Sequence, residues 1–176
     1  DVVDVICGFV FAGSETTRRQ LTAAVVALAE HPDDWERLAA DPGLVPGAVE
    51  EVMRLRPIVP GMRREAVETY DHRGLVLEPG ARVVTSFVAA NTDAAVFEDP
   101  DTFDLTRGNA DAHVTFGWGP HFCIGAGLAR VELQEALHAL VTTFGPPVLG
   151  DVVADQPGGR LLAPDALPVA FPPRAG

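Results

Sequence analysis

One cysteine of the chain stands in a glycine-rich run directly before a predicted helix. Cys123 has Gly117, Gly119 and Gly125 as near neighbours in the segment 116–130. A thiol at a helix N-terminus faces free backbone N–H groups and the positive end of the helix dipole, and both favour the thiolate. The glycines would let the backbone approach a flat cofactor closely, and hydrogen bonds to the sulfur would tune the potential of a bound iron. The segment therefore indicates a thiolate ligand for a metal-containing cofactor.

Taken alone, Cys123 has other interpretations. A lone cysteine is most often a small buried hydrophobic residue. A nucleophilic Cys123 with His121 or His138 as its base is a second interpretation, although the sequence places no acid or amide partner. A zinc site from His113, His121 and Cys123 lacks the paired spacing of such ligands, and a phosphate-binding loop would need Lys-Ser or Lys-Thr after the glycines. None of these interpretations accounts for the whole segment.

A second group of residues able to do chemistry lies in the hexapeptide at positions 12–17, inside a long predicted helix. Ala12 and Thr16 are four residues apart and share a face, so the Thr16 hydroxyl could donate to the Ala12 carbonyl. Gly13 weakens the helix locally, and the pair could open space for a small ligand and water. The plainer interpretation is a helix with two tolerated threonines and a surface glutamate, Glu15.

A third pair, Glu51 and Arg54, stands at i,i+3 on one face of a predicted helix. As an exposed ion pair it would contribute only about 0.2–0.5 kcal/mol. Such pairs are so frequent that the pattern means little by itself. The Glu51–Arg54 pair becomes informative because it lies between the other two groups in the sequence.

The elements that position these residues are mostly helical. Apolar residues recur almost all round the segment 2–30, which predicts a long and largely buried helix that ends before Pro32. Two turn sequences, Asp71-His72-Arg73-Gly74 and Glu78-Pro79-Gly80, predict a small antiparallel sheet over 66–88. The other expected elements are helices over 33–40, 46–55 and 124–144, a cysteine loop over 116–125, and short strands over 160–162 and 169–171.

Composition limits the classes of function. The chain has 176 residues with 13 basic and 25 acidic side chains, a net charge of −12, so nucleic acid and anionic membranes are not expected partners. No apolar run approaches the roughly 20 residues that span a bilayer. Cys7 and Cys123 could pair, but two cysteines are too few for a disulfide framework. A reducing cytoplasm is therefore the expected location.

The residues on both sides of Cys123 make the segment 116–130 specific enough to compare with known motifs. The run Phe-Gly-Trp-Gly-Pro-His-Phe-Cys-Ile-Gly-Ala-Gly-Leu-Ala-Arg closely resembles the haem-binding signature of bacterial cytochromes P450. The resemblance implies that Cys123 is the proximal ligand to the iron of haem b, that His121 donates to a haem propionate, and that Phe116 packs beside the sulfur. Gly117 and Gly125 would contact the cofactor. The sequence departs from the family at two positions: Trp118 stands where His is frequent and Gly127 where Pro is frequent.

The other two groups resemble further motifs of the same family. The hexapeptide is similar to the oxygen-activation motif, which implies that Glu15 and Thr16 form the acid–alcohol pair that relays protons, with Ala12 and Gly13 beside the cofactor. Glu51 and Arg54 resemble the structural Glu-x-x-Arg pair, whose third partner is a downstream arginine.

Two arginine assignments also follow from the resemblance. For the third partner of the Glu-x-x-Arg pair, Thr102 stands where an arginine is frequent, and Arg107 is the nearest substitute. At the entry to the sheet, the alignment places Arg64 at the propionate-binding position, with Arg63 as a plausible exchange.

The resemblance covers the chain in the order of the family and implies its C-terminal half, a mainly α fold with a small antiparallel β portion. The implied function is a monooxygenase that inserts one atom of O2 into a small apolar organic substrate. Electrons would come from NAD(P)H through a ferredoxin or flavoprotein reductase. A peroxide-using peroxygenase and a non-catalytic or vestigial haem-binding fragment are the alternatives.

Overall fold

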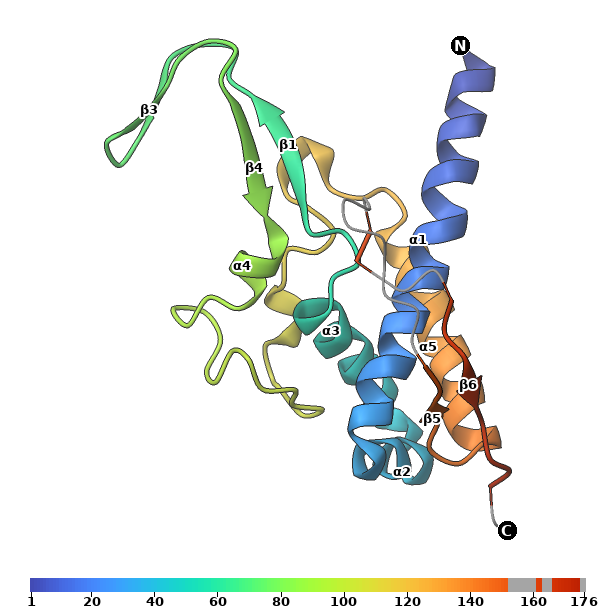
Figure 1. Cartoon of the computed structure of the whole chain (residues 1–176). Helices are drawn as coiled ribbons and strands as arrows, with labels where there is room; N and C mark the ends of the chain where they lie inside the picture. Colours follow the sequence, from blue (N-terminus) through green and yellow to red (C-terminus); the bar gives the residue numbers. More distant parts are fainter. Residues whose placement is uncertain (152–160, 163–165, 175–176) are drawn as a thin grey trace.

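The fold is described from a computed structural model, which covers residues 1–151, 161–162 and 166–174 (Figure 1). The helices are α1 (Val2–Glu30), α2 (Pro32–Ala40), α3 (Val45–Leu55), α4 (Phe87–Asn91) and α5 (Ala126–Thr143), with 3-10 turns η1 (Pro42–Leu44), η2 (Ala110–Ala112) and η3 (Gly119–His121). The strands are β1 (Gly61–Glu65), β2 (Tyr70–His72), β3 (Leu75–Leu77), β4 (Arg82–Ser86), β5 (Val148–Leu149) and β6 (Val169–Ala170). The expected class, mainly α with small antiparallel sheets, is confirmed.

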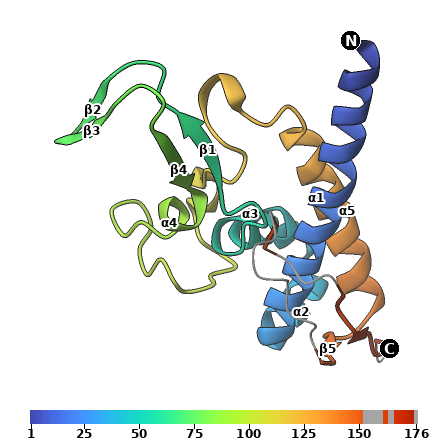
Figure 2. The ribbon, with the colours of Figure 1, turned by 45° about the horizontal axis from the view of Figure 1, so that its top comes forward.

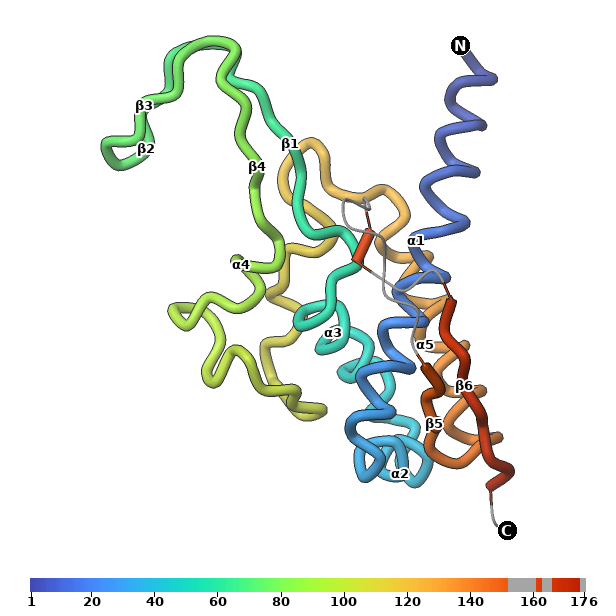
Figure 3. The backbone as a smooth tube through the Cα atoms, viewed as in Figure 1, coloured from blue at the N-terminus to red at the C-terminus, as the bar shows by residue number. Residues whose placement is uncertain are grey.

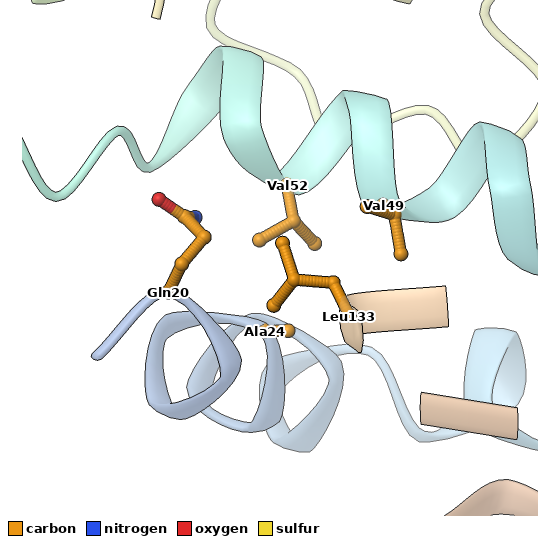
Figure 4. A pocket seen from close by; sticks show the side chains of 5 residues that line it. All are labelled: Gln20, Ala24, Val49, Val52 and Leu133. Atoms are coloured by element: carbon orange, nitrogen blue, oxygen red, sulfur yellow. The ribbon is translucent and has the colours of Figure 1, made fainter. Parts of the chain in front are cut away.

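The core lies where the second half of α1 packs with α2, α3 and α5. Its fully buried members include Leu28, Trp35 and Leu137, and the indole Nε1 of Trp35 donates to the Phe144 carbonyl over 3.0 Å. Figure 4 shows the meeting point of three of these helices, with side chains from α1, α3 and α5 in contact. The side chains at this junction leave no space for a water molecule; they are Gln20, Ala24, Val49, Val52 and Leu133. This junction of three helices is therefore packed side chain against side chain and holds no ligand cavity.

The first half of α1 differs from the expected buried helix. The helix begins at the N-cap Asp1, whose carboxylate accepts from the backbone N–H groups of Val3 and Asp4, and its first half stands clear of the other described segments (Figures 1 and 3). No described segment packs over it, so its large apolar side chains are exposed: Val2, Val3, Val5, Ile6, Phe9, Val10 and Phe11. Only the second half of α1 is buried, because that half alone lies against α2, α3 and α5.

The β portion also differs from the single sheet expected over 66–88. Over residues 61–86 it consists of two separate antiparallel pairs, β1 with β4 and β2 with β3, and pairing begins at Gly61. Gly61 approaches the Thr85 carbonyl so closely that a Cβ there would lie 2.2 Å from the oxygen. The expected strand end is replaced by α4, which Ser86 caps by accepting from the Ala89 N–H.

The C-terminal segment pairs β5 with β6, so a strand occupies part of the expected range 169–171. Of the strand expected over 160–162, Arg160 lies outside the described residues, and Leu161 and Leu162 form a bend. None of the helices in the described ranges has the length and apolar character needed to cross a membrane.

Candidate functional site

The cysteine loop is a set of tight turns that ends at the first turn of α5. Gly117 and Gly119 have φ values of 78° and 68°, in the left-handed region that glycine adopts at little cost. The Cys123 N–H donates to the Phe116 carbonyl over 2.9 Å, and the Cys123 carbonyl accepts from the Ala126 N–H over 3.2 Å. The loop therefore presents Cys123 directly before the α5 N-terminus, where the helix dipole favours an anionic sulfur.

The surroundings of the sulfur are open and apolar. Cys123 is exposed, which excludes the interpretation as a buried hydrophobic residue, and Trp118 and Ile124 are 83% and 86% exposed. A Cβ placed on Gly125 would lie 3.9 Å from the Cys123 Sγ, an ordinary van der Waals distance, so Gly125 lies directly beside the sulfur. The loop thus offers one sulfur ligand at a clear, apolar surface.

These features fit a haem better than the other ligands considered. Among the described residues, no group of three His, Cys, Asp or Glu side chains could hold a metal ion, so the zinc interpretation is wrong there. A haem iron needs only one protein sulfur, because the porphyrin supplies the other equatorial ligands. In the described ranges no hydrogen bond joins Cys123 to a histidine ring, so nothing supports a cysteine nucleophile with His121 or His138. Cys7 and Cys123 are both free.

The hexapeptide of α1 has the predicted local geometry. The Thr16 hydroxyl donates to the Ala12 carbonyl over 2.7 Å, as expected from their shared face. A Cβ on Gly13 would meet no atom within 4 Å, so the helix surface beside it is open. Glu15 lies beside two arginines, with its Oε1 at 2.9 Å from the Arg19 Nε and 3.5 Å from an Arg18 guanidinium nitrogen.

The hexapeptide and the cysteine loop lie on the same side of the core. Helices α1 and α5 pack together, and both begin at the end of the molecule that carries the cysteine loop (Figures 1 and 2). No hydrogen bond or ion pair between the described residues joins the two motifs directly. The structure therefore brings the two motifs to one end of the molecule.

Glu51 and Arg54 form a fully buried network, both side chains being 0% exposed. The Arg54 guanidinium donates twice to the Glu51 carboxylate, over 2.7 and 2.8 Å. It also donates to three backbone carbonyls, those of Asn91, Pro100 and Thr102, over 2.9, 2.7 and 3.1 Å. The pair is therefore the anchor of the segment 91–107, not an exposed helix pair.

Arg107 completes this network. Its Nε donates to the Glu51 Oε1 over 3.1 Å, and its other nitrogens donate to the carbonyls of Glu98, Asp99 and Thr102. Thr102, where the family often has arginine, contributes its backbone carbonyl to both arginines. The interpretation of Arg107 as the substitute partner is confirmed.

A second polar network escaped the sequence reasoning. The Glu50 carboxylate accepts two hydrogen bonds from Arg130, over 2.7 and 3.0 Å, and lies 3.1 Å from the His113 Nε2. Burial raises the pKa of Glu50, but the hydrogen bonds of His113 and Arg130 outweigh it and leave that pKa below its ordinary value. The hydrogen bond to Glu50 in turn raises the pKa of Arg130. The one available signal was the presence of Arg130 at the end of the signature.

Asn91 is a further residue that the sequence reasoning missed. It is fully buried, accepts from the Val114 N–H over 2.9 Å and donates to the Thr115 hydroxyl over 2.8 Å. Thr115 in turn donates to the Met53 carbonyl of α3 over 2.8 Å. Asn91 therefore fastens residues 114–115, which lead into the cysteine loop, to α3.

The remaining predicted ligand residues lie around the loop and on β1. Phe116 is half-buried, and its ring contacts those of His113 and Phe122 at centroid distances of 5.9 and 6.3 Å. The His121 ring is exposed and has no hydrogen bond or ion pair within the described ranges. Arg64 is half-buried on β1 and donates to the Arg63 carbonyl over 2.9 Å. Successive strand residues point to opposite faces, so Arg63 cannot occupy the same position as Arg64.

Comparisons with known proteins point to one family. The sequence profile of the family "Cytochrome P450" matches residues 43–157. The chain is 43% identical to the 20-oxo-5-O-mycaminosyltylactone 23-monooxygenase of Streptomyces fradiae, over 97% of this chain and 41% of that enzyme. It is 40% identical to the luteothin monooxygenase of Streptomyces thioluteus, over 91% of this chain and 40% of that enzyme.

Comparison of the fold with solved structures points to the same family. The crystal structure of the Tepidiphilus thermophilus P450 heme domain matches with a TM-score of 0.89 and 34% identity, over 94% of this chain and 40% of that one. The chain spans about two fifths of the length of the curated relatives that it matches.

Proposed function

The chain belongs to the cytochrome P450 family, and from this membership we propose that it forms the haem-thiolate part of a monooxygenase acting on a small apolar organic substrate. The observation that carries the proposal is the setting of Cys123. Its side chain is exposed before the α5 N-terminus, and its N–H is held by the Phe116 carbonyl. Electrons would come from NAD(P)H through a ferredoxin or flavoprotein reductase.

Several residues would hold haem b. Cys123 would bind the iron through its sulfur, while His121 and Arg64 would donate to the propionates. Contacts with the rest of the cofactor would come from Ala12, Gly13, Phe116, Gly117 and Gly125. When bound, the haem supplies the iron chemistry that activates O2 for insertion of one oxygen atom into the substrate. The family membership and the single sulfur at an apolar surface support this assignment.

Glu15 and Thr16 would transfer protons at the site. The Thr16 hydroxyl donates to the Ala12 carbonyl over 2.7 Å, so its oxygen lone pairs remain free to accept from a water at the site. Glu15 is held by Arg18 and Arg19, and rotation away from them would let it exchange protons with solvent. The pair favours the use of O2 over peroxide, because only the O2 route needs this proton supply.

A carbon monoxide spectrum tests the thiolate. The haem-reconstituted, dithionite-reduced protein should show a strongly red-shifted Soret band that disappears in Cys123→Ala. Cys7→Ala is the matched control, because Cys7 is also an exposed, free cysteine and should leave the band unchanged. An unshifted band in the unaltered protein would show that Cys123 is not the ligand, and absence of haem uptake would show that these residues do not hold haem by themselves. Haem uptake without oxygen-dependent turnover would favour the non-catalytic or vestigial alternative.

Oxygen consumption tests the proton route. Thr16→Val should lower the product formed per O2 consumed, whereas Thr17→Val, a neighbouring half-buried threonine, should not. A Thr16→Val protein that couples O2 to product as well as Thr17→Val would exclude a role for this hydroxyl. Turnover supported by peroxide and not by O2 with reductase would favour the peroxygenase alternative.

A further inference from the structure

Glu50 is the neighbour of Glu51 on α3 but faces different partners. Its carboxylate receives two charge-assisted hydrogen bonds from Arg130 and one contact from His113, over 2.7, 3.0 and 3.1 Å. The His113 side chain is 0% exposed and that of Glu50 is 13% exposed. A directional network of this kind is far better shielded from water than the exposed ion pairs of the chain.

The protonation of His113 follows from its second contact. The Thr115 N–H donates to the His113 Nδ1 over 3.2 Å, so Nδ1 must carry a lone pair. The proton of a neutral ring then sits on Nε2 and is donated to Glu50. The Thr115 N–H therefore sets the tautomer of His113, and Glu50 accepts from Nε2 and holds the ring in its orientation.

Both partners of Glu50 lie against Phe116. The Arg130 guanidinium stands 4.6 Å from the centre of the Phe116 ring, and the His113 ring stands 5.9 Å from it on a tilted plane. The Phe116 carbonyl accepts the Cys123 N–H over 2.9 Å. A short chain of contacts thus runs from Glu50 through Arg130 and His113 to Phe116, and from Phe116 to Cys123.

We propose that Glu50 is a positioning residue for Cys123: by holding Arg130 and His113 against Phe116, it fixes the sulfur in the geometry needed for thiolate ligation. The inference rests on the proposed function, because it assumes that Cys123 is the haem ligand. Glu50 touches neither the cofactor nor the substrate in this role. Loss of its charge frees Arg130 and releases Phe116, and the Cys123 N–H loses its fixed acceptor.

The test compares Glu50→Gln with Glu36→Gln in the haem-loaded protein. The two substitutions make the same change of charge and shape, but Glu36 pairs with Arg174 at the surface of α2. In the reduced carbon monoxide complex, Glu50→Gln should convert most of the red-shifted Soret band to the unshifted form, and Glu36→Gln should not. A band in Glu50→Gln equal to that of Glu36→Gln would overturn the proposal.

A double-mutant cycle distinguishes action through Arg130 from an independent effect. If Glu50 works through Arg130, the variant Glu50→Gln, Arg130→Gln should lose no more of the red-shifted band than the worse single variant. Additive losses would show that Glu50 acts elsewhere and would overturn the proposed chain of contacts.

Amide hydrogen exchange on the haem-free protein gives a readout that needs no cofactor. Glu50→Gln should accelerate exchange of the Cys123 amide by about tenfold relative to Glu36→Gln, while α1 and α2 stay unchanged. Equal acceleration in α1 and α2 would show a general structural role and contradict the proposal. Survival of the red-shifted band in Cys123→Ala would instead refute the proposed function, so the two failures are distinguishable.

Discussion

Replacing Arg54 with alanine should strongly destabilise the fold and abolish haem retention. The side chain is fully buried and makes two hydrogen bonds to Glu51 and three to backbone carbonyls. Removing one partner of a buried ion pair costs about 3–5 kcal/mol, because the other charge is left without compensation. A domain is usually stable by only about 5–15 kcal/mol. Arg54→Ala should therefore lose much of the total stability, and the cysteine loop should lose haem with it.

Urea unfolding and haem content measure the effect. A loss of about 3–5 kcal/mol corresponds to a midpoint lowered by about 2 M urea for an ordinary dependence of stability on urea. Arg56→Ala is the control, since Arg56 pairs with Glu30 at the surface and should cost about 0–1 kcal/mol. Equal midpoints and equal haem content in the two variants would refute the reasoning.

Four further variants test other parts of the structure. Arg107→Ala should cost about 2–3 kcal/mol in urea unfolding, less than Arg54→Ala, because it leaves the central ion pair intact. The lowered pKa of Glu50 stabilises the fold above its ordinary value of 4.5, and this stability is lost as pH falls through the folded-state pKa. Glu50→Gln should therefore show a flatter fall in stability between about pH 5 and pH 3, and an unchanged slope would contradict the assignment. Gly61→Ala should destabilise the β1–β4 pair, because its Cβ would lie 2.2 Å from a carbonyl oxygen, whereas Gly8→Ala, with open space around it, should raise the melting temperature.

The elements that the sequence predicts well carry strong local signals. The long apolar repeat and Pro32 give α1 its limits of Val2 and Glu30, and the glycines around Cys123 predict a tight loop before a helix. The strand β1 was missed because Met-Arg-Arg-Glu has neither apolar alternation nor β-branched residues. Its pairing depends instead on the close approach that Gly61 allows.

The polar networks could be predicted only in part, because their partners are distant in sequence. Glu51 and Arg54 are three residues apart and are visible as a pair. Glu50 instead meets His113 and Arg130 across separations of 63 and 80 residues, and no local pattern encodes such contacts. The resemblance to a family supplied the third partner of the Glu51 network, but nothing comparable indicated the partners of Glu50.

The two adjacent glutamates explain why α3 carries charge in a mainly apolar core. Successive residues of a helix point about 100° apart, so Glu50 faces His113 and Arg130, on either side of the cysteine loop in the sequence, and Glu51 faces the segment 91–107. Apolar side chains would fill the same space at least as stably, since buried ion pairs seldom exceed apolar packing in free energy. Apolar groups cannot, however, satisfy backbone carbonyls, and no strand among the described residues pairs with the segment 91–107. Arg54 and Arg107 take up this task by donating to carbonyls of Asn91, Glu98, Asp99, Pro100 and Thr102. Buried charge therefore replaces secondary structure here, and it holds in place the segment that leads into the cysteine loop.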